Sequence, residues 1–139
     1  MQRLPSAPQI LGENGTTRLV LYRKDRVNIV KGADLLRNFR LKPQSKTCRV
    51  IASCCNTPVF LDFKSGHWLS LYGSLWPAGT LPPLEMRTMT SDLTDASVLS
   101  DDVPNPKRHT FSFFTKLLGA WAAMGFRIPK VAVNGEIDA

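Results

Sequence analysis

Between residues 17 and 72 the chain alternates short apolar segments with polar turn residues, and this pattern constrains its fold more than any other feature. Each apolar segment is five or six residues long. Segments of this length that are rich in branched and aromatic residues are typical of β-strands. About six of them within 56 residues predict an antiparallel, all-β core. The expected strands are residues 17–22, 26–30, 36–41, 48–52, 59–63 and 67–72.

The pattern changes to a helical one near the C-terminus. Apolar residues recur there at positions i, i+3, i+4 and i+7, which predicts a helix over residues 110–126 that packs on the sheet. Thr110 or Ser112 is suited to cap its start, and Gly125 to end it. These four apolar residues are Phe114, Leu117, Leu118 and Trp121.

The remaining segments complete a prediction of one domain over residues 1–139. Prolines and glycines interrupt residues 1–16, so we expect an irregular N-terminal segment. The β core extends over residues 17–90, with one further strand expected at residues 84–89. Residues 91–109 are predicted to be an acidic surface loop.

Composition limits the class of protein and the compartment that we expect. Hydrophobic residues make up 43% and charged residues 21% of the 139 residues, which is typical of a globular domain. No apolar run approaches the roughly 20 residues that span a bilayer, and the N-terminus lacks the apolar core of a secretory signal. An odd count of three cysteines argues against a secreted disulfide scaffold. We therefore expect a cytoplasmic protein with no membrane partner.

The net charge of +7 is unevenly distributed along the chain. Residues 17–64 contain eleven Lys or Arg against three Asp, a net charge of +8, whereas residues 85–105 have a net charge of −4. The basic half is able to attract a partner protein, an anionic ligand or nucleic acid. Nucleic acid is the least favoured of these, because aromatic residues are not regularly interleaved with the cations. A solvated basic face is the favoured explanation, because the basic residues are spaced through the strand-like segments and are not packed in one block.

A pair of adjacent cysteines is the main candidate for chemistry. Cys54 and Cys55 end an apolar segment and precede the turn-forming residues 56–58. Three interpretations stay open: zinc ligands, reactive thiols, or small apolar side chains packed in the core. Cys48 is expected to be a core residue. His67 is expected to be satisfied or solvent-facing, and His109 to lie in a loop before the helix.

Several segments resemble the family of glutathione-dependent formaldehyde-activating enzymes and centromere protein V. The resemblance covers roughly residues 10–72 and is closest to a branch whose metal knuckle reads Cys-Cys-x-Thr-Pro. It implies a mainly β, β-tent-like fold of small antiparallel sheets around zinc, with one C-terminal helix. The segments that resemble the family are residues 15–17, 27–32, 39–41, Arg49 and residues 54–59.

The resemblance also implies a function and a zinc site. Family members carry out a carbon–sulfur-lyase-type reaction on a small thiol adduct such as a glutathione conjugate. Of the family knuckle, Cys-x-x-Cys-Gly-Thr-Pro, Cys55 matches the second cysteine, Ala52 stands in place of the first, and Asn56 replaces glycine. Cys54 and Cys55 are therefore the expected zinc ligands of a truncated or degenerate member. The alternative is a non-enzymatic β domain that binds a partner protein or an anionic ligand through its basic half.

Overall fold

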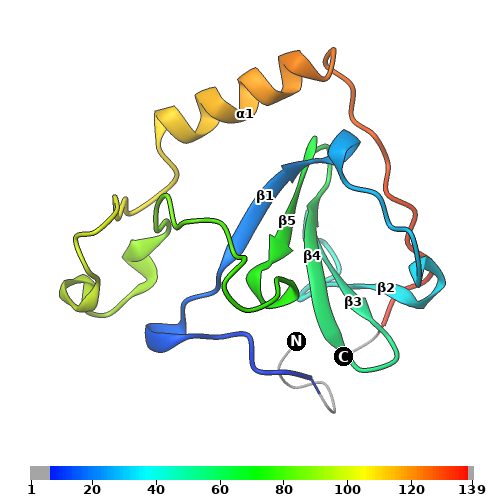
Figure 1. The fold of residues 1–139 in the computed structure, drawn as a ribbon, viewed down its shortest axis with the longest axis horizontal. Coiled ribbons are helices and arrows are strands. Elements are labelled where there is room, and N and C mark those ends of the chain that lie inside the picture. Colours follow the sequence, from blue (N-terminus) through cyan, green and yellow to red (C-terminus); the bar gives the residue numbers. More distant parts are fainter. Residues whose placement is uncertain (1–6, 138–139) are drawn as a thin grey trace.

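A computed structural model describes residues 7–137 of the chain as a five-stranded antiparallel sheet with one helix (Figure 1). The strand order is β1-β5-β4-β3-β2, so β2 to β5 form a meander and β1 pairs with β5. The predicted mainly β fold with a C-terminal helix is confirmed, with the strands joined into one sheet. The strands are β1 (Leu19–Arg23), β2 (Leu36–Phe39), β3 (Thr47–Ala52), β4 (Thr57–Phe63) and β5 (Trp68–Tyr72).

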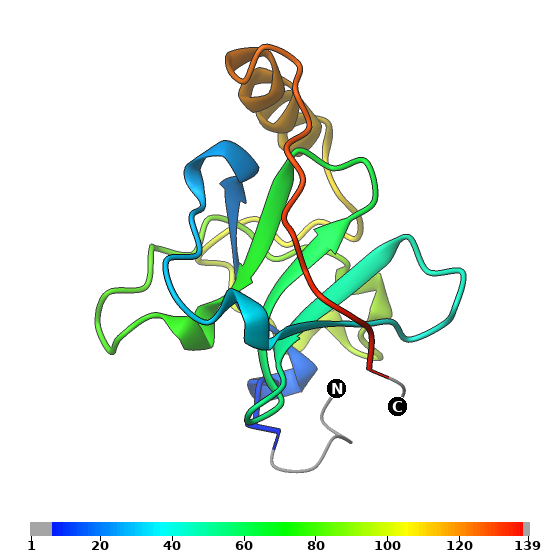
Figure 2. The ribbon, with the colours of Figure 1, turned by 90° about the vertical axis from the view of Figure 1, so that its right-hand side faces the viewer.

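One hydrophobic cluster lies on one face of this sheet, and further buried residues, among them Phe39, Ile51 and Tyr72, lie outside it. The buried residues of the cluster are contributed by four neighbouring strands, which places their side chains in one layer. Two irregular segments cover that layer, residues 27–29 and residues 131–133, and the second crosses the sheet as the C-terminal part of the chain (Figure 2). The buried residues of the cluster are Leu36, Val50, Phe60 and Leu69.

Two of the predicted strands are wrong. Residues 27–30 follow the 3₁₀ turn η2 (Lys24–Arg26) with irregular backbone, although the predicted alternation does turn Val27 and Ile29 toward the core. Residues 84–89 are also irregular, and Arg87 N donates to Pro104 O instead of joining the sheet. Neither segment forms a strand ladder: Val27 and Ile29 pack on the core from irregular backbone, whereas Leu84 and Met89 are exposed.

The predicted acidic loop contains short 3₁₀ turns and is held by one cation. Arg87 Nη1 lies 2.8 Å from Asp102 Oδ1, and its guanidinium lowers the pKa of that exposed carboxyl. The neighbouring Asp101 is exposed, as expected. The 3₁₀ turns of the chain, besides η2, are η1 (Glu13–Gly15), η3 (Ala33–Leu35), η4 (Gly73–Leu75), η5 (Thr90–Asp92) and η6 (Ala96–Val98).

The helix α1 (Phe111–Ala123) has the predicted ends. The Thr110 side chain accepts a hydrogen bond from Phe113 N at 3.2 Å, and Gly125 has the positive φ of +66° that helix ends favour. The helix lies beyond one end of the sheet and does not cover its face (Figures 1 and 2). None of its residues is buried. In residues 7–137 no helix is long and apolar enough to cross a membrane.

Candidate functional site

The two adjacent cysteines lie in the turn that joins β3 to β4. β4 starts at Thr57, directly after this turn, and runs toward the β4–β5 turn, where His67 contacts helix α1. The cysteines are therefore at the opposite end of the sheet from the helix. Both side chains are exposed, which excludes the interpretation that they are packed core residues.

The backbone of this turn follows from its sequence. Asn56 adopts φ +53°, the left-handed region that asparagine tolerates better than most residues, in agreement with its place where the family has glycine. Cys55 N donates to Ala52 O at 3.3 Å and closes the turn. Pro58, which is buried, pairs with Ile51 beside an irregularity in the β3–β4 register. Asn56, which tolerates the left-handed backbone, and Pro58, whose ring fixes φ, thus flank the start of β4 at Thr57.

The thiols are close to one another and to a hydroxyl. Cys54 Sγ lies 3.6 Å from Cys55 Sγ, and Cys55 Sγ lies 2.9 Å from the Thr57 hydroxyl oxygen. Hydrogen bonds from the Thr57 hydroxyl and backbone N–H, and then from Cys54, lower the pKa of Cys55. The Cys54 pKa is raised, first because its thiol donates to Cys55 and second by partial desolvation. Cys55 therefore loses its proton more readily than Cys54, and Cys54 is the donor of the pair.

The separation of the two sulfurs fits a shared metal ion. Two thiolates on one tetrahedral zinc, each ~2.3 Å from the metal, lie ~3.8 Å apart, and the two sulfurs are 3.6 Å apart here. The same ligand geometry requires two further donors. Within residues 7–137, however, no group of three or more His, Cys, Asp or Glu side chains is arranged to hold a metal. Of the four ligands that a closed zinc site needs, the pair would account for two.

The other candidate residues lie elsewhere. Cys48 is half-buried near the start of β3, and its thiol donates to Asn38 Oδ1 at 2.9 Å, so it is more polar in its contacts than the predicted core residue. His67 is buried and satisfied, as predicted: its Nε2 donates to Leu117 O at 2.7 Å. His109 is exposed before the helix, as predicted, and stacks on Phe113 with ring centroids 4.6 Å apart. None of the three joins the thiol pair.

The sequence analysis missed Thr57 as a functional residue. Its signal is present in the sequence, because a hydroxyl two residues after a turn cysteine is well placed for a local side-chain hydrogen bond. The turn-forming character of residues 56–58 by itself predicts only the shape of the turn.

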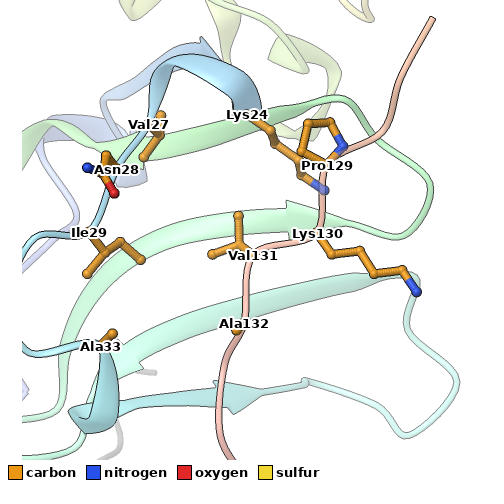
Figure 3. Close-up of a pocket in the computed structure, with 9 residues that line it drawn as sticks. All are labelled: Lys24, Val27, Asn28, Ile29, Ala33, Pro129, Lys130, Val131 and Ala132. Atoms are coloured by element: carbon orange, nitrogen blue, oxygen red, sulfur yellow. The ribbon is translucent and has the colours of Figure 1, made fainter.

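A shallow groove of about 240 Å³ is the second feature that the sequence did not indicate (Figure 3). Val27, Ile29 and Val131 form its apolar wall, and Lys24 lies at one end. The Lys24 ammonium is already 2.8 Å from Asp62 Oδ1, and the Lys130 side chain extends away from the groove (Figure 3). The groove therefore offers little uncompensated positive charge, and binding of an anionic ligand by the basic half stays a prediction.

Comparison of the chain with protein-family models, with curated proteins and with solved structures finds no match. The relationship to the zinc-binding family consequently rests on the residues quoted above and stays a prediction. The geometry of the thiol turn is independent of that relationship.

Replacing Thr57 with valine tests the origin of the Cys55 thiolate. Valine keeps the shape and the backbone N–H but removes the hydroxyl, so we expect the Cys55 pKa to rise. The thiolate exists above that pKa and is lost as the pH falls through it, so alkylation by iodoacetamide near neutral pH should slow about fivefold. Mass spectrometry of the Cys55 peptide measures the rate. Thr47→Val, at the start of β3, is the matched control, and equal rates in both variants would contradict the assignment.

Proposed function

We propose that this chain is a zinc-binding thiolate domain that acts on a small thiol adduct, such as a glutathione conjugate, at the Cys54–Cys55 turn. The observation that carries the proposal is the 3.6 Å separation of two exposed sulfurs, which suits two ligands of one tetrahedral ion. The residue pattern of the turn supports the same conclusion, because it resembles the knuckle of a zinc-binding family. A reducing compartment such as the cytoplasm keeps both thiols available.

Each residue of the turn has a distinct part in this proposal. Cys55 is the principal ligand, because hydrogen bonds from Thr57 favour its thiolate, the form that binds metals. Cys54 is the second ligand, and it binds after losing the proton it shares with Cys55. A bound zinc ion would supply Lewis-acid polarisation of an oxygen and would hold a substrate thiolate. Exposure of both sulfurs leaves room for a small thiol at the remaining positions.

Metal binding by single-cysteine variants tests the proposal. We expect the wild-type protein to take up about one Zn²⁺ per chain in a competition titration with a chromogenic chelator. Cys55→Ser should weaken binding about 100-fold, and Cys54→Ser should weaken it less, because Cys54 is the poorer thiolate. Binding of Cd²⁺, followed by thiolate-to-metal absorption, gives a direct readout of sulfur ligation.

Cys48→Ser is the matched control, since Cys48 is a thiol on the same strand that lies apart from the pair. It should bind zinc as the wild-type protein does. Zinc uptake that Cys55→Ser leaves intact would exclude this turn as the site, and a wild-type protein without zinc affinity would exclude the function. The non-enzymatic alternative, a domain that binds through its basic half, predicts the second result.

A further inference from the structure

Helix α1 presents a row of large apolar side chains to solvent. Phe111 is 88% exposed, Phe114 55% and Leu118 56%, and Phe126 and Ile128, which follow the helix in the chain, are 59% and 42% exposed. Together these side chains expose on the order of 500 Å², given the size of aromatic side chains. An exposed apolar patch of several hundred Å² on a globular domain marks an interaction surface. We call these five residues the α1 apolar row.

The adjoining side of the helix is fixed to the body of the protein. Leu117 O accepts a hydrogen bond from buried His67, and Trp121 stacks on the His67 ring with centroids 5.8 Å apart. Met124, directly after the helix, is 2% exposed. The predicted apolar stripe is therefore divided between two sides, with Leu117 turned inward and Phe114 and Leu118 turned outward. The outward exposure results from a defined helix orientation.

The chain segment that carries the row has charge of one sign, and the one carboxylate recorded against it is Glu85. Residues 103–135 contain five Lys or Arg and no Asp or Glu. Lys116 is the cation within the helix, and its contact with Glu85, 3.5 Å long, joins two side chains that are 76% and 80% exposed. Such an exposed pair is weak and is easily exchanged for another anion. The other four cations are Lys107, Arg108, Arg127 and Lys130.

The shape of this surface indicates its partner. Helix α1 forms a ridge at one end of the molecule (Figures 1 and 2). A ridge needs a complementary groove in a protein partner, whereas a lipid surface receives it without one. Exposed Phe and Leu on a helix whose flanking segments carry Lys and Arg are typical of helices that lie in the interface of anionic membranes. At 13 residues, the helix is ~20 Å long and suits lying in the surface, not spanning it.

We propose that the α1 apolar row and the cations around it dock the domain on an anionic lipid bilayer. Phe111, Phe114 and Leu118 enter the boundary between headgroups and acyl chains, and the cations contact lipid phosphates and carboxylates. The sequence-based expectation of no membrane partner was drawn from the lack of a long apolar run and of a secretory signal, and neither bears on a helix that lies in the membrane surface. The lipid proposal is independent of the zinc proposal, because the cysteines lie at the other end of the sheet.

Co-sedimentation of the purified protein with lipid vesicles tests the proposal. We expect binding to phosphatidylcholine vesicles that contain phosphatidylserine to be about tenfold stronger than to phosphatidylcholine alone, and to weaken as salt is added. The variant Phe111→Ser/Phe114→Ser/Leu118→Ser should lose at least about tenfold of that binding. Val30→Ser is the matched control, because Val30 is equally exposed, at 88%, but lies outside the helix.

A second variant distinguishes a loss of lipid binding from a loss of folding. Lys107→Glu/Arg108→Glu leaves the row intact and reverses two charges before the helix, so it should weaken binding to acidic vesicles while circular dichroism stays unchanged. Absence of vesicle binding by the wild-type protein would overturn the proposal. So would equal binding to neutral and acidic vesicles, or concentration-dependent dimerisation that the triple variant abolishes, since that result assigns the row to a second copy of the chain.

Discussion

Phe60→Ala is expected to reduce the free energy of unfolding by about 3–5 kcal/mol, the usual cost of truncating a buried phenylalanine. Phe60 is 1% exposed at the centre of β4. It pairs with Val50 on β3 and Leu71 on β5, so its ring packs between two neighbouring strands. Truncation removes favourable transfer of the ring from water and leaves a cavity, because the paired strands cannot close around alanine.

Urea denaturation followed by tryptophan fluorescence measures this loss. Phe114→Ala is the control: it removes the same side chain from a position that is 55% exposed, and it should change stability by less than about 0.5 kcal/mol. A similar loss in both variants would mean that the face of the sheet bearing Phe60 is not the main core. Because β4 begins at Thr57, Phe60→Ala should also disturb the thiol turn at denaturant concentrations below the wild-type midpoint.

The strands could be predicted from the sequence wherever apolar alternation and strand pairing coincide. The β3, β4 and β5 segments have both, and their bounds lie close to the expected ones. The segment after Arg26 has the alternation but no strand beside it, and it crosses the core face as irregular backbone. Apolar residues at every second position predict which side chains turn inward. They do not predict which neighbouring segment forms hydrogen bonds with the backbone.

Only part of the candidate site could be predicted from the sequence. Sequence reasoning identified Cys54 and Cys55 and the left-handed turn at Asn56, because these are local properties of adjacent residues. It did not find the Thr57 hydrogen bond or the short distance between the sulfurs, which depend on side-chain rotamers. The orientation of helix α1 could not be predicted either, because its apolar stripe is wide enough for either side to face the sheet. The contact between His67 and Leu117 O, 50 residues apart, fixes that orientation.

The ion pair between Lys24 and Asp62 supports a second prediction with a large effect. Lys24 is a lysine whose side chain is only 5% exposed, and its ammonium lies 2.8 Å from Asp62 Oδ1. This oxygen is inaccessible to solvent and, among residues 7–137, accepts no hydrogen bond of good alignment, so the ammonium charge is its main compensation. Removing either partner leaves a charge in a poorly solvated place, which costs several kcal/mol when burial is complete. Because Asp62 is 26% exposed, we expect a smaller loss of about 2 kcal/mol for Asp62→Ala.

A double-mutant cycle separates the pair from its surroundings. Lys24→Met and Asp62→Leu should each destabilise the protein, whereas the double variant should recover most of the loss, because it replaces two charges with apolar groups of similar size. Arg23 and Asp25 form the matched control: their 2.6 Å ion pair is on the adjoining residues, and its side chains are 26% and 21% exposed. Removing that pair should cost less than about 1 kcal/mol. Additive losses in the Lys24–Asp62 cycle would show that the two charges are solvated independently, and Lys24 would then be free to bind an anion in the groove.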